Sequence, residues 1–279
     1  MKTIHKIIIG DSRNMQELFD ESVNLIVTSP PYPMIEMWDD LFRKMDERIN
    51  QLWLNFERET NPKIKNNLIQ QIFELMHKNL AQVWKECYRV LLSDGYLCIN
   101  IGDATRSIAN SFRLFPNHSK IIEYCESIGF NLIGQIFWKK PTNKPNAFLG
   151  SGFLPPNAYV TLDCELILIF KKGEPKENEF ISQIWEIPGT KQTVEERRVG
   201  AFPEKVPAQL IKMFSEPGDT VLDPFLGTGT TVKVAIELKR NSIGYEIDES
   251  LIPIIKKKLN LSQSLLIPSY EVKLTKRKP

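Results

Sequence analysis

Residues that bind metals or form disulfides are scarce in this sequence. Its 279 residues include four cysteines, with no Cys-x-x-Cys pair, and three histidines without metal-ligand spacing to them. We therefore expect reduced thiols and no metal site. The residues concerned are Cys87, Cys98, Cys125, Cys164, His5, His77 and His118.

Long hydrophobic runs and an excess of one charge are also absent. A membrane-spanning helix needs about 20 apolar residues, which no run approaches, and the apolar run near the N-terminus is too short for a secretion signal. These absences predict a cytoplasmic protein with no membrane partner. The net charge of +2 and pI near 8.2 require no polyanionic partner. For the basic residues 273–279 we expect a solvated tail, with phosphate contact as the alternative.

Short runs of β-branched residues alternate with segments of helical periodicity. This pattern is typical of a parallel sheet with crossover helices, and 42% hydrophobic residues suffice for one large core. We predict a single α/β domain over residues 1–279, with a seven-stranded, mostly parallel sheet and helices on both faces. The predicted strands cover residues 3–10, 24–28, 96–101, 131–138, 164–170, 220–223 and 242–247, and the helices 69–91, 118–128, 204–215, 229–240 and 249–260.

Two segments do not fit this alternation. Residues 34–64 are rich in Met, Trp and charge, and residues 139–163 are rich in Pro, Gly and Asn. Long irregular insertions in a compact α/β domain are usually functional or mobile loops. We therefore expect specificity to reside in these two segments.

A glycine loop follows the predicted strand 220–223, in the sequence DPFLGTGTT. Gly227 and Gly229 let the backbone approach a ligand, and either of the two following threonines, at 230 and 231, is a candidate cap for the next helix. The loop lacks the lysine of a phosphate-binding P-loop, and Val232 replaces the third glycine of a dinucleotide fingerprint. Glu246, at the end of the next strand, suits the two ribose hydroxyls of an adenosine. The pattern predicts S-adenosylmethionine as cofactor.

A second motif, Ser29, Pro30, Pro31 and Tyr32, ends the predicted strand 24–28. Since ligands bind outside the carboxyl ends of parallel strands, we expect this quartet to face the glycine loop. The serine hydroxyl and the Pro30 carbonyl suit the hydrogens of a planar amino group, and the tyrosine suits stacking on its heterocycle. No cysteine follows a proline, so methylation at cytosine carbon 5 is not expected.

Four motifs together, TSPPY, AFPEKVP, DPFLGTGTT and GYEID, resemble the amino-methylating DNA methyltransferases. Their order is that of the β group, in which the catalytic motif precedes the cofactor motif. The resemblance implies a Rossmann-like, S-adenosylmethionine-dependent methyltransferase fold with a catalytic half at 1–138 and a cofactor half at 200–260. The resemblance leaves segment 34–64 and much of 139–163 unmatched. We take both segments as candidate target-recognition insertions, with a dimer contact or a simple extension of the fold as the alternatives for 34–64.

The resemblance also implies roles for single residues. The quartet Ser29 to Tyr32 would hold a flipped base, and Asp11 would lie near the adenosine, with a strand-end turn as the alternative. Phe202 and Pro203 would close over the methionine part of the cofactor, with a core position as the alternative for the phenylalanine. The residues implied to line the cofactor site are Asp223, Phe225, Gly227 and Gly229, with Glu246 on the ribose.

Serine as the first residue of the quartet favours cytosine N4 as the methylated atom, because the adenine N6 enzymes of this family tend to carry aspartate there. Adenine N6, RNA and protein amides remain alternative targets, as does a regulator without turnover. Duplex DNA is the implied partner, and a cognate restriction endonuclease would be the second unless the enzyme is solitary. The candidate DNA contacts are Lys139, Lys140 and Lys144 for phosphates and Asn143 and Asn146 for bases, with a solvated loop as the alternative.

Overall fold

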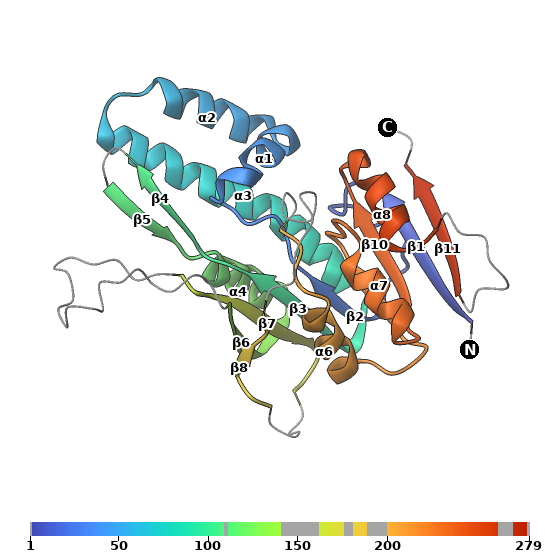
Figure 1. The fold of residues 1–279 in the computed structure, drawn as a ribbon. Coiled ribbons are helices and arrows are strands. Elements are labelled where there is room, and N and C mark those ends of the chain that lie inside the picture. The colour runs from blue at the N-terminus through green and yellow to red at the C-terminus, as the bar shows by residue number, and fades with distance from the viewer. Residues whose placement is uncertain are drawn as a thin grey trace.

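The computed structural model describes residues 2–108, 111–140, 162–175, 181–188, 200–261 and 270–277. Their central feature is a nine-stranded sheet in the order β11-β1-β10-β9-β2-β3-β7-β6-β8 (Figure 1). All neighbours pair in parallel except β7, which is antiparallel to both β3 and β6. The strands are β1 (Thr3–Ile9), β2 (Val23–Thr28), β3 (Leu91–Ile101), β6 (Phe130–Lys139), β7 (Cys164–Lys172), β8 (Ile184–Glu186), β9 (Thr220–Asp223), β10 (Asn241–Glu246) and β11 (Tyr270–Lys276).

The mostly parallel α/β sheet is confirmed, and each of the seven predicted strands is present. The predicted strand count was too low, because β8 and β11 extend the sheet at its two edges. β8 is only three residues long, and β11 overlaps the segment 273–279, for which we expected a solvated tail. Instead β11 pairs along the whole of β1, and the Arg277 side chain donates to the Asp11 carbonyl (2.8 Å) and to Glu17.

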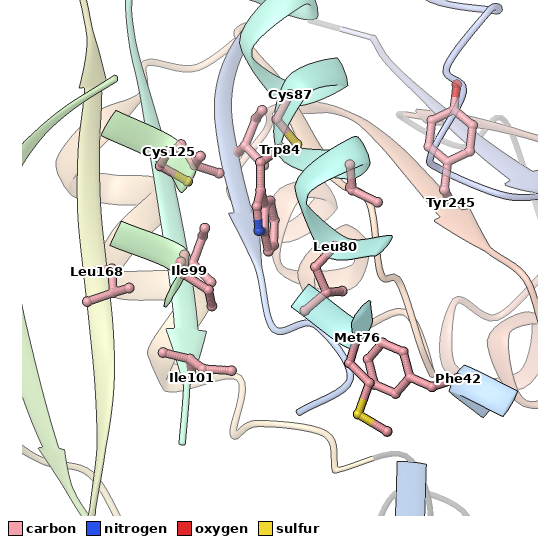
Figure 2. Packing of buried hydrophobic residues seen from close by; sticks show 14 of the residues in the cluster. Phe42, Met76, Leu80, Trp84, Cys87, Ile99, Ile101, Cys125, Leu168 and Tyr245 are labelled. Atoms are coloured by element: carbon pink, nitrogen blue, oxygen red, sulfur yellow. The ribbon is translucent and has the colours of Figure 1, made fainter. Parts of the chain in front are cut away.

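Helices cover both faces of the sheet because successive residues of each central strand point to opposite sides. Leu97, Ile99 and Ile101 of β3 pack with α3 (Pro62–Val90) and α4 (Asn117–Ser127). Cys98, between them, packs on the other face with α6 (Lys205–Phe214) and α7 (Thr230–Glu237). Figure 2 shows the first layer, in which Leu80 and other residues of one side of α3 point at the sheet. A fifth helix, α8 (Ile252–Lys258), covers β1.

Segment 34–64 is helical, which corrects the expectation of an irregular insertion. It holds η1 (Glu36–Trp38), α1 (Asp39–Met45), α2 (Glu47–Arg58) and the start of α3. Capping residues explain the breaks: Asp46 accepts the backbone N–H of Arg48, and Asn61 accepts that of Lys63 with Pro62 in the first turn. Buried Ile49 and Trp53 then hold α2 against the core.

A separate hairpin of β4 (Ala104–Ile108) and β5 (Ser111–Phe115) follows β3. Arg106 of β4 donates to the Met34 carbonyl at 2.7 Å and pairs with Asp39 at 2.6 Å, so the hairpin is tied to the chain that leaves the Ser29–Tyr32 quartet. Across the six described ranges, none of the helices has the length and apolar character that crossing a membrane would require.

Candidate active site

Strands β2 and β9 are neighbours, and both end at the same edge of the sheet. Their ends are joined by the Thr28 hydroxyl, which donates to Asp223 Oδ1 at 2.7 Å. The quartet and the glycine loop therefore begin side by side, as expected. They line one hollow, here called the strand-end pocket, whose walls are Ser29, Gly200, Ala201, Phe202, Asp223, Phe225, Leu226, Gly227, Thr228, Thr230 and Thr231.

The glycine loop turns sharply between β9 and α7. Gly227 has φ of +55° and Gly229 has φ of +92°, a left-handed region in which side chains with a Cβ are strained. Gly229 precedes α7 without a side-chain cap, so neither Thr230 nor Thr231 has the capping role that we considered. The Thr231 hydroxyl donates instead to Asp223 Oδ2 at 2.6 Å.

Asp223 holds this turn together from inside. It is 3% exposed, and its carboxylate accepts from Thr28, from Thr231 and from the backbone N–H of Phe225 at 3.1 Å. Burial raises the pKa of Asp223, and the hydroxyl donors work in the opposite direction. The residue thus fastens the glycine loop to the end of β2.

Glu246 closes the other side of the loop. Its carboxylate accepts the backbone N–H groups of Gly227 (2.7 Å) and Asp248 (2.8 Å). The residue is 8% exposed, and burial raises its pKa to about 7 against these two hydrogen bonds. Each carboxylate oxygen has a further lone pair, so the group retains acceptor capacity for a diol. A carboxylate beside a loop with two glycines fits the nucleoside part of the expected cofactor.

The other residues expected around the cofactor differ in their placement. Phe202 lines the strand-end pocket, while Pro203 is buried and its carbonyl accepts the Val206 N–H where α6 begins. Asp11 follows β1 in a strand-end turn, and its place near the adenosine stays a prediction. Its two carboxylate oxygens accept the backbone N–H and the Nε–H of Arg13, each at 2.8 Å.

The quartet is fastened through its tyrosine. Tyr32 OH lies 3.0 Å from Ser29 Oγ and donates to Glu165 Oε2 at 3.0 Å. Asn100 Nδ2 donates to the same hydroxyl at 2.8 Å. A Cβ on Gly102 would lie 3.1 Å from Tyr32 Cε2, so the glycine leaves the space that the ring fills. Burial, and then the charge of Glu165, raises the pKa of Tyr32 well above its usual value.

A buried network of hydrogen bonds supports the backbone after the quartet. Asn117, at the start of α4, donates to the carbonyls of Pro33 (3.0 Å) and Gly102 (2.9 Å). Its Oδ1 lies 3.0 Å from Nε2 of His77, a histidine of α3 whose pKa burial lowers to about 4. A neutral imidazole is therefore part of the scaffold, and α3 is connected to the backbone that follows the quartet.

Glu165 and Asn100 are site residues that sequence reasoning missed. Both interrupt apolar strands, β7 and β3, at positions where a charged or amide group needs a specific partner. That mismatch was the available signal. The residues lie together because β3 and β7 are paired near the same edge, with Asn100 opposite Ile167.

The candidate DNA contacts are only partly described. Lys139 Nζ lies 3.5 Å from the carboxylate of Glu186, and Lys140 pairs with Glu165 beside the quartet. Asn143, Lys144 and Asn146 lie outside the described residues, as does most of segment 139–163. Their role in DNA binding stays a prediction.

No group of three or more His, Cys, Asp and Glu side chains within the described ranges is arranged to hold a metal ion. A second hollow, a polar groove between α3 and β5, contains none of the predicted site residues. Its walls are Asn66, Asn67, Gln70, Gln71, Glu74, Leu75, Lys78, Phe112 and Arg113.

Comparison with solved structures supports the same fold. TTHA0409 of Thermus thermophilus, solved in complex with S-adenosyl-L-methionine, matches with a TM-score of 0.67 and 25% identity over 97% of this chain and 99% of that chain. The cytosine-N4-specific PvuII DNA methyltransferase matches with a TM-score of 0.62 over 98% and 96%; at 20% identity this likeness concerns the fold alone.

Sequence comparison identifies the family. The type II methyltransferase M.MjaI of Methanocaldococcus jannaschii is 59% identical over 99% of this chain and 97% of its own length. M.MthZI of Methanothermobacter thermautotrophicus, also a type II methyltransferase, is 41% identical over 93% and 78%. The family model for N6 and N4 methyltransferases, described as DNA methylase, matches residues 23–257. The chain belongs to this N6/N4 family of DNA methylases.

Proposed function

We propose that the protein is a site-specific DNA methyltransferase that methylates the exocyclic N4 amine of cytosine in duplex DNA, with S-adenosyl-L-methionine as donor. The observation that carries this proposal is the strand-end pocket, where Ser29 of the catalytic quartet and the glycine loop form one cavity wall. Membership of the N6/N4 family makes the protein a DNA methylase. The choice of cytosine is the finer part of the proposal.

S-adenosyl-L-methionine fits the residues beside the pocket. Glu246 would accept the ribose hydroxyls, while Gly227 and Gly229 leave room for close backbone approach and Phe202 would cover the methionine part. When bound, the cofactor supplies a methyl group on a sulfonium, which is already activated for transfer. The protein therefore needs no covalent nucleophile, and its task is to position the acceptor.

The acceptor amine is a weak nucleophile because its lone pair is delocalised into the base. Ser29 Oγ and the Pro30 carbonyl would hold its two hydrogens out of the ring plane, which restores the lone pair and directs it. Pro30 and Pro31 are buried, their rings fix φ, and Pro31 confines Pro30 to the extended region, so the direction of the Pro30 carbonyl is restricted. The Tyr32 ring would then stack on the base.

Access to the amine requires the base to leave the duplex, at a cost of a few kcal/mol. The insertions 34–64 and 139–163 are the proposed source of compensating contacts, with Lys139 among the phosphate ligands. Because its relatives M.MjaI and M.MthZI are named type II methyltransferases, we infer a place in a restriction-modification system with a cognate endonuclease.

The methylated base can be identified directly. The purified protein is incubated with duplex DNA and methyl-labelled S-adenosyl-L-methionine. The DNA is then digested, and its nucleosides are separated by chromatography and identified by mass spectrometry. We expect the label in the N4-methyl derivative of deoxycytidine. Label in N6-methyldeoxyadenosine would keep the family chemistry and overturn the choice of cytosine, and DNA without label would overturn the proposed activity.

Cofactor affinity should depend on pH through Glu246. Only the ionised carboxylate accepts two hydroxyl hydrogens, and its pKa of about 7 makes it roughly one-tenth ionised at pH 6 and nine-tenths at pH 8. We therefore expect the Kd for S-adenosyl-L-methionine to fall about tenfold over that range, measured by calorimetry. Glu246→Gln should bind weakly and without this dependence. A wild-type Kd that is constant from pH 6 to 8 would contradict the role.

The same group affects stability of the unliganded protein with the opposite sign. Since the folded pKa is raised from 4.5, the folded state binds this proton more tightly than the unfolded chain does. Its contribution to stability is present below pH 4.5 and is lost as the pH rises toward 7. Cofactor should thus stabilise the protein more strongly at pH 8 than at pH 6.

A further inference from the structure

Glu165 is a largely buried carboxylate in direct contact with Tyr32 of the quartet. Its side chain is 13% exposed at the start of β7. Oε2 accepts from Tyr32 OH at 3.0 Å and from Asn100 Nδ2 at 2.6 Å, and Oε1 pairs with Lys140. Tyr32 OH continues to Ser29 Oγ at 3.0 Å. A hydrogen-bonded chain therefore runs from the strand-end pocket to the carboxylate.

The carboxylate fixes the direction of every bond in this chain. An ionised carboxylate only accepts, so the single hydroxyl hydrogen of Tyr32 is committed to Glu165. The Asn100 amide must likewise present its NH₂ group, because its oxygen would repel the carboxylate at 2.6 Å. The remaining contact, between Ser29 and Tyr32, then has Ser29 as its donor.

This direction determines what Ser29 offers to a ligand. Its own hydrogen points inward to Tyr32, and its lone pairs are left for the strand-end pocket, whose wall it forms. With the opposite direction, Ser29 would present a hydrogen to the pocket and would oppose an amine donor there. Glu165, two hydrogen bonds away from Ser29, therefore determines that Ser29 acts as an acceptor toward the pocket.

We propose that Glu165 is a positioning residue that makes Ser29 a hydrogen-bond acceptor toward the target amine, acting through the hydroxyl of Tyr32. The inference rests on the proposed function, because it assumes an amine at Ser29. Lys140 forms an ion pair with the Glu165 carboxylate and so balances its charge, and its Nζ also lies 5.1 Å from the centre of the Trp138 ring. The raised pKa of Tyr32 keeps its hydrogen in place at neutral pH.

Glu165→Gln tests this direction with little change of shape. The glutamine NH₂ donates to Tyr32, which turns the tyrosine hydrogen toward Ser29 and the serine hydrogen toward the pocket. We expect the single-turnover rate of methyl transfer at saturating cofactor and DNA to fall about 100-fold, the range of a lost acid-base or acceptor contact. Binding of S-adenosyl-L-methionine should change less than about twofold. Glu165→Asp, which keeps the charge, should recover part of the rate.

A matched control lies at the other end of the same strand. Glu21 pairs with Lys172 of β7 at 3.1 Å, outside the site. Glu21→Gln therefore removes a comparable carboxylate-lysine contact and should leave the rate unchanged.

A double-mutant cycle separates positioning from general support of the fold. Tyr32→Phe keeps the ring beside Gly102 and removes the hydroxyl, so it should slow transfer as Glu165→Gln does. Adding Glu165→Gln to Tyr32→Phe should then cost nothing more. A wild-type rate in Glu165→Gln, or fully additive losses in the double variant, would overturn the inference.

Two further results separate this inference from the proposed function: the folding of Glu165→Gln and the activity of Ser29→Ala. If Glu165→Gln does not fold, as its melting curve would show, Tyr32→Phe alone tests the chain, and a wild-type rate in that variant refutes it. Full activity of Ser29→Ala would refute the role of Ser29 and this inference with it, whereas DNA without label from the wild-type protein would refute the proposed function. An inactive Ser29→Ala beside a fully active Glu165→Gln would refute this inference alone.

Discussion

Replacing Ser29 with alanine is expected to slow methyl transfer about 100-fold, or ~2.7 kcal/mol of transition-state stabilisation, while the Kd for S-adenosyl-L-methionine stays the same. The hydroxyl is one of two acceptors proposed to draw the amine hydrogens out of the base plane, and the Pro30 carbonyl remains in the variant. The methyl side chain of alanine fits the space of serine, so the strand-end pocket keeps its shape. Single-turnover kinetics with labelled cofactor measure the effect.

The exposed Ser127 provides the control for this experiment. Its hydroxyl donates to the Tyr124 carbonyl at the end of α4 and has no contact with the quartet. Ser127→Ala should therefore transfer the methyl group at the wild-type rate. If Ser29→Ala loses cofactor affinity instead of rate, the serine supports the pocket and does not hold the amine.

Replacing Gly227 with valine is expected to weaken cofactor binding roughly 100-fold, again ~2.7 kcal/mol. Gly227 has φ of +55°, where a β-branched residue is strained, and its N–H is bonded to the Glu246 carboxylate. Gly227 also lines the strand-end pocket, so a shift of its backbone would change the pocket wall. Calorimetric titration with S-adenosyl-L-methionine measures the loss.

Gly134 of β6 is a suitable control glycine, since a Cβ there would meet nothing within 4 Å. Gly134→Val should fold and bind cofactor normally. Equal cofactor affinity of Gly227→Val and wild type would place the cofactor elsewhere in the molecule. A loss of folding in Gly227→Val, seen by its melting curve, would be examined with Gly227→Ala, which has the same backbone strain and a smaller side chain.

Much of the arrangement could be predicted from local sequence, for a physical reason. The strands are buried on both faces, so their apolar runs are conspicuous, and the carboxyl ends of parallel strands meet at one edge. That rule correctly brought Ser29 and Gly227 to one pocket. The family and the fold are confirmed by the comparisons, whereas the cytosine target and the residue roles stay predictions.

Other features depend on contacts that sequence periodicity does not contain. β11 is recognised as a strand only through its pairing with β1, since its residues are half exposed. The helices of segment 34–64 are short, and their boundaries depend on the caps Asp46 and Asn61. Glu165 was missed because the rule for parallel sheets considers carboxyl ends, and this residue begins an antiparallel strand.

The reversed direction of β7 has a consequence for how such enzymes can diversify. Lys139 at the end of β6 pairs with Cys164 at the start of β7, so the chain between them leaves and re-enters the sheet at the edge that holds the active site. Loop closure becomes only slowly more costly as a loop lengthens. Selection can therefore exchange or lengthen this one connection, which we propose takes part in target recognition, while the strands beside the cofactor site are inherited unchanged.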